Sequence, residues 1–241
     1  MPDSRSHRGP HPDDRRLFAP EDVPVLRKAM SDYCWLLTRG YAQKSSLKLV
    51  GDHFSLTQRQ RLALMRAACS QQQAADRERR RIATAELPHQ SLVVDGYNLL
   101  ITIEAALSGA AIFRGVDGCY RDLAGMHGSY RKVNETMPAI ATIGRFLSNW
   151  EVDDVQWLLD KPVSNSGRLK THICSAAEQN EWNWRVDLVL SPDHTLAQSD
   201  DIVVSTDSAI LDRDIRWTNL AADVIDSDIP DAWMLDLSMR R

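Results

Sequence analysis

The chain has 241 residues, 43% of them hydrophobic, and a formal net charge of −4. This length allows one medium domain or two small ones with a hydrophobic core, and no run of about 18 apolar residues is present to span a membrane. The first residues, MPDSRSHRGPHPDDRR, lack the apolar stretch of a secretory signal, and four scattered cysteines without a CxxC pair are typical of reduced thiols, so we expect a cytoplasmic protein.

The charge is unevenly divided along the chain. Residues 1–90 contain 16 Lys and Arg against 10 Asp and Glu, a net charge of +6, whereas residues 91–241 contain 13 against 23, a net charge of −10. Two solvated surfaces of opposite sign account for this pattern. A basic half that attracts a polyanion and an acidic half that gathers metal ions account for it equally well.

The N-terminal part reads as helical. Residues 1–19 are rich in Pro, Arg and Asp and have almost nothing to bury, so we expect a disordered tail. Helical spacing of apolar residues predicts one helix that ends near Gly40 and, after a linker over residues 42–53, a long helix over residues 55–84 that Ser55 or Thr57 caps. We therefore expect a helical domain over residues 20–88, which Pro88 closes.

Several charged residues lie around the predicted linker and the start of the long helix. A network of helix caps and salt bridges explains them, and an RNA-binding surface is the alternative. The residues are Lys48, Asp52, His53, Arg59 and Arg61.

The pattern changes after residue 90, where short apolar runs alternate with helical segments. Strands are predicted in SLVVD, VDDVQWLLD, WRVDLVLSPD and DIVVSTD, and TMPAIATIGRFLSNWE is typical of an amphipathic helix. This alternation predicts an α/β domain over residues 91–241, in which a Rossmann-type parallel sheet has helices on both faces.

A carboxylate closes each of the four predicted strands. These residues are Asp95, Asp160, Asp193 and Asp207. In an open parallel sheet, ligands bind outside the carboxyl ends of the strands, so these side chains are expected to converge. Their mutual repulsion calls for a cation, and oxygen ligands suit Mg²⁺ or Mn²⁺, which hold and activate phosphodiesters. An ordinary explanation also exists, because Asp favours turns and helix N-caps, and Asp207 before SAIL has the position of a cap.

Three further residues are weaker candidates for this site. Asn98 follows the turn after Asp95, where its amide can bond the Asp95 carboxylate or a phosphate. Glu104 lies about two turns into the next predicted helix, facing either the cluster or water. Asp122 lies in a glycine-punctuated stretch, RGVDGCYRDLAGMHGSYRKV.

Two segments offer cations to a phosphate backbone. In the glycine-punctuated stretch, basic residues alternate with Tyr120 and Tyr130, a composition that suits phosphate contacts and base stacking or a plain solvated insertion. In DKPVSNSGRLK, donors surround Asp160 without the spacing of a Walker loop, so this segment is an anion cradle or a simple polar loop. The candidate RNA-binding residues are Arg114, Arg121, Arg131 and Lys132 in the first segment and Lys161, Ser164, Ser166, Arg168 and Lys170 in the second.

Taken together, VVDGYNLL, the strand ending in LLD and VVSTDSAIL resemble a PIN-like domain of the NYN type. The chain also resembles the domain-of-unknown-function 434 proteins, which pair a helical N-terminal part with a PIN-like C-terminal part. The first part is similar to LKLVGDHFSLTQRQRLALMRAACS, and the second to VDGYNLLITIEAALSG, RGVDGCYRDLAGMHGSYRKV and LLDKPVSNSGRLK. The resemblance covers about residues 20–225. It implies a metal-dependent ribonuclease with Asp95, Asp160 and Asp207 as metal ligands. The sequence departs from that pattern before Asp207, where SPDHTLAQSDD is too short for a full helix, so Asp193 substitutes or the cluster is weaker.

These observations leave more than one function open. The first is a Mg²⁺- or Mn²⁺-dependent endoribonuclease acting on structured or single-stranded RNA, in which Asp95, Asp160 and Asp207 are catalytic and Asp193 is a further metal ligand. The second is an inactive PIN-like protein that binds RNA, and the third is a hydrolase of small phosphate esters. RNA is the expected partner, a membrane is not expected, and a homo-oligomer stays open.

Overall fold

A computed structural model describes residues 7–124 and 130–238 of the chain. The N-terminal part consists of helices, as the sequence predicts. The first long helix, α2, buries Leu26, Met30 and Tyr33 at helical spacing. The N-terminal elements are α1 (Asp14–Leu17), α2 (Val23–Thr38), α3 (Gln43–His53), α4 (Gln58–Ala67), α5 (Gln71–Arg80) and the 3₁₀ helix η1 (Thr84–Glu86).

Two predictions for this part are wrong. The supposed linker contains α3, whose Gly51 packs so closely that a β-carbon there would lie 2.5 Å from Nε of Arg61. The supposed long helix is two helices, α4 and α5, because the backbone is extended at Ala68 and Ser70 caps a new helix. Thr57 is the predicted cap of α4, and its hydroxyl and the Gln60 side chain form a capping box.

The described part of the expected disordered tail, residues 7–19, is folded against the protein, and residues 1–6 lie outside the described residues. Leu17 and Phe18 are buried, and the carboxylate of Asp14 pairs with Arg59. Arg8 reaches the fully buried Glu104 at 2.7 Å. Few apolar residues predicted disorder here, but long-range ion pairs and two apolar side chains are enough to order this segment.

A five-stranded parallel sheet organises the rest of the chain, with strand order β5-β4-β1-β6-β7. Every recorded pairing within it is parallel, from β1 with β4 to β6 with β7. Its strands are β1 (Ser91–Asp95), β4 (Asp154–Asp160), β5 (Trp184–Val189), β6 (Ile202–Val204) and β7 (Trp217–Thr218).

Helices cover both faces of this sheet, so its strands are apolar on both sides. Leu92 and Val94 of β1 belong to the core on one face, and Val93 belongs to the core on the other. The first face packs against α6 (Gly96–Leu107), α7 (Thr136–Asn149), α8 (Ser166–Asn180) and α11 (Leu220–Asp228), and the second against α9 (Pro192–Leu196) and α10 (Ser208–Leu211). The fold is thus the predicted α/β class, with helices on both faces of a parallel sheet.

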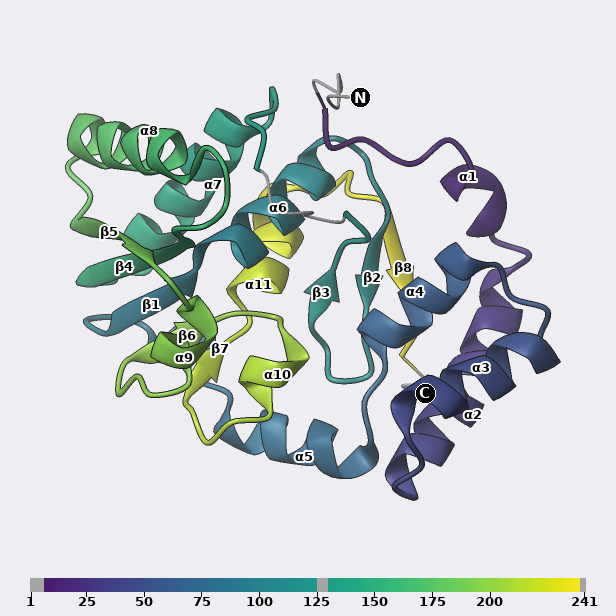
Figure 1. Cartoon of the computed structure of the whole chain (residues 1–241). Helices are drawn as coiled ribbons and strands as arrows, with labels where there is room; N and C mark the ends of the chain where they lie inside the picture. The colour runs from purple at the N-terminus through teal and green to yellow at the C-terminus, as the bar shows by residue number, and fades with distance from the viewer. Residues whose placement is uncertain (1–6, 125–129, 239–241) are drawn as a thin grey trace.

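A second, three-stranded sheet joins the two parts of the molecule. It has the order β3-β2-β8 and consists of β2 (Ile112–Arg114), β3 (Tyr120–Arg121) and β8 (Met234–Asp236). Phe113 and Leu235 of this sheet share one hydrophobic cluster with Leu26, Met30 and Leu64 of the helices. Figure 1 shows α2, α3 and α4 gathered beside these strands, with α7 and α8 on the opposite side of the molecule. The boundary predicted near residues 88–91 therefore crosses a shared core.

Candidate functional site

The candidate site lies where the strand order of the large sheet reverses. Chain order runs from β1 to β4 and β5 on one side and then to β6 and β7 on the other, so the switch falls between β1 and β6. Ligands of open α/β sheets bind outside the carboxyl ends of the strands at such a point. Asp95 is the last residue of β1 and Asp160 the last residue of β4, as predicted.

Two of the four predicted strand-end acids follow their strands at a distance. β5 ends at Val189, and Asp193 lies in the first turn of the one-turn helix α9. β6 ends at Val204, and Asp207 is the N-cap of α10, with its carboxylate accepting a hydrogen bond from the Ala209 amide at 2.7 Å. The capping interpretation of Asp207 is therefore confirmed. Both residues still stand at the carboxyl edge of the sheet.

Asp95 also caps a helix, because α6 begins directly at Gly96 without a separate turn. A β-carbon at Gly96 would lie 2.6 Å from Cδ2 of Leu159 and 2.8 Å from the carbonyl oxygen of Leu158. Glycine is therefore needed for close approach to β4. The turn expected between Asp95 and Asn98 is therefore the first turn of α6.

A hydroxyl group connects Asp95 with the segment that carries Asp207. Ser205 donates from Oγ to the Asp95 carboxylate at 2.9 Å, and the Asp207 amide donates to the same Oγ at 3.1 Å. Next to it, the Asn98 side-chain oxygen accepts from the amide of Thr206 at 2.9 Å and from its hydroxyl at 3.0 Å. These bonds join the β1–α6 junction to the β6–α10 segment across the switch point.

The acids at this edge influence each other's ionisation. Burial raises the pKa of Asp95 to about 7, hydrogen bonds from Ser205 and the Asn98 amide oppose this, and the charges of Asp207 and Asp193 add to it. Burial also raises the pKa of Asp160, and the charge of Asp193 adds to the rise. The four acids therefore form one electrostatically linked set, which we call the carboxylate edge: Asp95, Asp160, Asp193 and Asp207.

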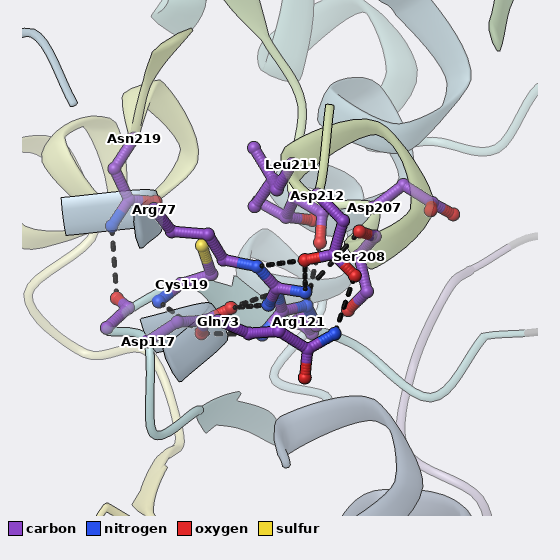
Figure 2. A network of polar contacts seen from close by, with 12 residues as sticks. Gln73, Arg77, Asp117, Cys119, Arg121, Asp207, Ser208, Leu211, Asp212 and Asn219 are labelled. Carbon is purple, nitrogen blue, oxygen red and sulfur yellow. Dashed lines mark hydrogen bonds and ion pairs between the residues drawn. The ribbon is translucent and has the colours of Figure 1, made fainter. Parts of the chain in front are cut away.

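Two buried arginines fix the backbone on either side of Asp207 (Figure 2). Arg121 donates from Nε to the Thr206 carbonyl at 2.8 Å, and Arg77 of α5 donates to the Ser208 carbonyl at 3.4 Å. Both guanidinium groups bind the buried Asp117, with Arg77 at 2.5 Å and Arg121 at 2.7 and 2.9 Å. Burial tends to raise the pKa of Asp117, but these guanidiniums outweigh it and hold that pKa far below its usual range.

The same arginine ties α5 to α10. Arg77 binds the Asp212 carboxylate at 2.6 and 2.9 Å, and Gln73, one turn earlier, donates to that carboxylate at 2.7 Å. The carbonyl of Arg77 accepts from the Trp217 indole at 2.8 Å. The N-terminal helices therefore help to hold the segment that carries Asp207.

The carboxylate edge has the donor chemistry of a Mg²⁺ or Mn²⁺ site, because its ligands are hard oxygen atoms. Among the residues that the structure describes, no three His, Cys, Asp or Glu side chains come together in an arrangement that would hold a metal ion. Mg²⁺ usually keeps several waters and binds through one or two carboxylates together with substrate phosphates. Asp95 and Asp207 fit that smaller protein contribution.

A buried hydroxyl group near this edge lacks a partner among the described residues. The Tyr97 hydroxyl on α6 is buried without a hydrogen bond, and burial together with the charge of Asp160 raises its pKa to about 12. A buried donor without a partner costs free energy unless water or a ligand satisfies it. The site thus has a donor available on the Asp160 side.

The three weaker candidates occupy different surroundings. Asn98 binds Thr206 through its side chain and bonds Asp95 through its backbone amide, at 3.4 Å from Oδ1. Asp122 is buried and accepts from Thr102 Oγ1 at 2.9 Å, beside Asn98 and Asp207 in one cavity. Glu104 points elsewhere: it is fully buried and binds Arg8, Tyr130 and Thr136.

The glycine-punctuated stretch does not present its aromatic residues to solvent. Tyr120 is buried and donates to Asp226 at 2.9 Å, and Tyr130 is buried against Glu104, so neither is available to stack on bases. Arg121 is buried in the network around Asp117 and is lost as a phosphate ligand for the same reason. Arg114 lies 3.9 Å from Asp236, whereas Arg131 and Lys132 are exposed. The part of this stretch over residues 125–129, including His127, lies outside the described residues.

The predicted anion cradle after Asp160 is only partly a loop, because α8 begins at Ser166. Ser166 is buried and donates to the Lys161 carbonyl at 3.4 Å, so its hydroxyl is engaged within the protein. The other members reach solvent: Lys161, Ser164 and Arg168 are exposed and Lys170 is half-buried.

The charged group of the N-terminal helices forms the predicted salt-bridge network. Asp52 lies 2.7 Å from Lys48 and 2.8 Å from Arg61, while Arg59 binds Asp14. The four cysteines are free thiols, as expected. None of the helices within residues 7–124 and 130–238 is long and apolar enough to cross a membrane.

Sequence reasoning missed several residues that shape the site: Ser205, Thr206, Tyr97, Arg77 and Asp117. The segment VVSTD contained a usable signal, since two hydroxyl residues directly precede the last acid. No local pattern marked Arg77 or Asp117, because their roles depend on contacts between residues 40 positions apart.

Comparison with known proteins gives a family for this fold and site. The family described as "Domain of unknown function (DUF5616)" matches residues 84–223, more than half of the chain. The chain belongs to the DUF5616 family. Residues 25–80 match the family described as "Protein of unknown function (DUF434)", which confirms the resemblance stated for the N-terminal helices.

The DUF5616 region contains the whole carboxylate edge, and Arg77, which braces it, comes from the DUF434 match. An uncharacterized protein of Methanocaldococcus jannaschii is 29% identical over 187 residues, covering 77% of this chain and 88% of the relative. No solved structure matches the chain.

Proposed function

We propose that this protein is a metal-dependent endoribonuclease that uses the carboxylate edge, and that its α/β half is a PIN-like domain of the NYN type. The observation that carries this proposal is the hydrogen-bonded link from Asp95 through Ser205 to Asp207 across the sheet's switch point. The strand order β5-β4-β1-β6-β7 supports it, because that order sets the ends of β1, β4 and β6 side by side.

Asp95 and Asp207 would hold Mg²⁺ or Mn²⁺, with Asp160 and Asp193 beside them. Such an ion, when bound, neutralises a phosphodiester, activates a water and stabilises the leaving oxygen. Ser205 and the Asn98 amide keep the Asp95 carboxylate oriented through their hydrogen bonds. The braced backbone around Thr206 and Ser208 restricts where the Asp207 carboxylate can stand.

Exposed cations near the edge would hold the phosphates on either side of the cleaved bond. Lys161 directly follows Asp160, and Arg168 lies in the first turn of α8. Cationic side chains supply most of the sequence-independent affinity for a phosphate backbone. A cytoplasmic location agrees with free thiols, and a homo-oligomer stays a prediction.

The test is a cleavage assay on mixed RNA and DNA substrates with Mg²⁺ or Mn²⁺. Asp95→Asn keeps the size of the side chain and removes its charge, so we expect cleavage to fall by at least about 100-fold while folding is kept. Asp154→Asn is the matched control: Asp154 opens the strand that Asp160 closes and pairs with Arg185 at 2.9 Å. Equal cleavage in EDTA, or by Asp95→Asn, would contradict the proposal.

A second function is an RNA-binding protein without catalytic activity. The capping bond of Asp207 favours it, as does the lack of three grouped metal ligands among the described residues. Titration with Mn²⁺ distinguishes the two functions. Saturable binding that Asp95→Asn and Asp207→Asn abolish supports the nuclease, whereas RNA affinity without Mn²⁺ binding supports the second function.

A further inference from the structure

A cavity of about 360 Å³ lies between the N-terminal helices and the α/β part, beside Asp207. Ligand pockets usually range from about 300 to 1,000 Å³, so this volume suits one small moiety. Residues from both family matches line it, and among them are Gln43, Met65, Arg66, Asn98, Asp122 and Asp207.

Of the two arginines that line this cavity, Arg66 and the buried Arg121, Arg66 is partly exposed and is held in a defined position. Arg66 donates to the Asp122 carbonyl at 2.8 Å and to the Ala124 carbonyl at 3.2 Å. It also lies 3.7 Å from the Asp122 carboxylate, and its side chain stays 33% exposed. A guanidinium group has five N–H donors in a fixed planar fork. The two carbonyls therefore fix the orientation of Arg66 and leave further donors for an anion.

The other walls offer a flat apolar contact and amide donors. Met65 is 37% exposed although it is apolar, and a thioether packs adaptably against ring systems. The contacts of the Asn98 side chain with other described residues use its oxygen, so within this part of the chain its NH₂ group is left for a ligand. Gln43, exposed at the start of α3, adds a second amide, and amides pair with the edges of nucleobases.

We propose that this cavity holds one unstacked nucleotide of a single-stranded RNA segment, next to the bond that the carboxylate edge cleaves. Arg66 binds a phosphate of that nucleotide, Met65 packs on the face of its base, and Gln43 and Asn98 bond the base edge. The inference rests on the proposed function and adds to it the substrate class, together with the role of the N-terminal helices. A base of a duplex would have to unstack and flip out to enter such a cavity, so single-stranded RNA is favoured over duplex RNA.

Binding is tested separately from cleavage, in the Asp95→Asn background. Fluorescence anisotropy measures the affinity for a labelled single-stranded RNA 12-mer, the matching DNA strand and an RNA hairpin of the same length. We expect Met65→Ala and Arg66→Gln each to weaken binding of the RNA strand by roughly tenfold. Arg66→Gln also lowers the slope of log K against log salt concentration by about 0.7, the value for one phosphate contact on a single strand.

Arg79→Gln is the matched control, because Arg79 is exposed on α5, pairs only with Asp76 among the recorded ion pairs and does not line the cavity. It should change affinity less than about twofold. Since Arg66→Gln removes bonds to two carbonyls, thermal melts accompany it. Gln43→Ala and Met65→Ala change exposed side chains and test the cavity without that complication.

Photo-crosslinking gives the position of the nucleotide directly. RNA with a single 4-thiouridine is expected to crosslink to the tryptic peptide of residues 62–66, which contains Met65.

Unchanged affinity in all three cavity variants, or tighter binding of the hairpin or the DNA strand, overturns the inference. If the cavity variants, made in the wild-type protein, cleave RNA as fast as the wild type, the inference about the cavity is wrong and the proposed nuclease function stands. RNA bound in the cavity without cleavage by the wild-type protein supports the inference and overturns the nuclease.

Discussion

At the scale of single residues, Asp95 combines two structural roles with an unfavourable electrostatic environment. It ends β1, caps α6 and stands beside other acids, while burial raises its pKa to about 7. An ionised carboxylate in such a place lowers stability in the absence of a cation, and function is the usual reason to keep such a group. The hydrogen bond from Ser205 lowers the free-energy cost of burying the ionised Asp95 carboxylate.

The raised pKa of Asp95 predicts a defined pH dependence of stability in EDTA. The native state keeps this proton up to about pH 7, whereas the unfolded state loses it near pH 4, so the free energy of unfolding falls between these values. The contribution is at most about 1.4 kcal/mol per pH unit. Urea unfolding at pH 5 and pH 8 should show Asp95→Asn gaining stability over the wild type as pH rises. Parallel pH profiles of the two proteins would contradict this.

At the scale of elements, the short helix α10 depends on partners outside itself. Its four residues are too few to form a stable helix alone. Arg77 of α5 binds the Asp212 carboxylate and the Ser208 carbonyl, and Asp117 neutralises that arginine. Helix α5 therefore stabilises the β6–α10 segment that carries Asp207 (Figure 2).

Loss of the Arg77 contacts with Asp212 and Ser208 should destabilise α10. Arg77→Met leaves the Asp212 carboxylate without its cation and the buried Asp117 with Arg121 alone. Breaking a buried ion pair costs up to about 3–5 kcal/mol of folding stability. We expect a lower urea midpoint and faster tryptic cleavage at the exposed Arg213, which follows α10. Arg79→Met, at an exposed position of the same helix, is the control. It should change the urea midpoint and the rate of cleavage at Arg213 only slightly. A slow cleavage at Arg213 in Arg77→Met would show that α10 is held by other contacts.

At the scale of the whole molecule, one hydrophobic cluster spans the two family matches and the C-terminal strand. Phe113 and Leu235 of the small sheet pack with Leu26 and Met30 of α2. The segment around Arg8 adds ion pairs to the α/β part, such as that with Glu104. The helices and the small sheet therefore share a hydrophobic core, and they lie side by side in Figure 1.

This shared core predicts that residues 84–241 alone will not reach the stability of the full chain. Without the helices, the small sheet exposes Phe113 and Leu235, and Asp117 loses Arg77. We expect the fragment to bind a hydrophobic dye and to unfold at lower urea concentration. The full chain should show one transition by fluorescence and by circular dichroism. Two separate transitions of the full chain would contradict a single unit.

The sequence by itself determined those features that local patterns encode. The period of apolar residues predicted β1, β4 and α7 and the α/β class, and aspartates at strand ends indicated the edge of the sheet. Capping signals left Ser55 and Thr57 as candidates for the start of the helix, of which Thr57 caps α4. Each of these depends on neighbours within a few positions, which a single sequence displays.

Only the tertiary structure decided which side chains were buried and which were brought together. Tyr120, Tyr130 and Arg121 have the composition of an RNA-binding loop, yet distant partners draw them into the interior. Helix α3 exists although its sequence resembles a linker, because packing against α2 and α4 supports it. Met65 and Asn98 line the same cavity beside Asp207 although they lie far apart in the sequence. No local sequence pattern predicts such contacts between distant residues.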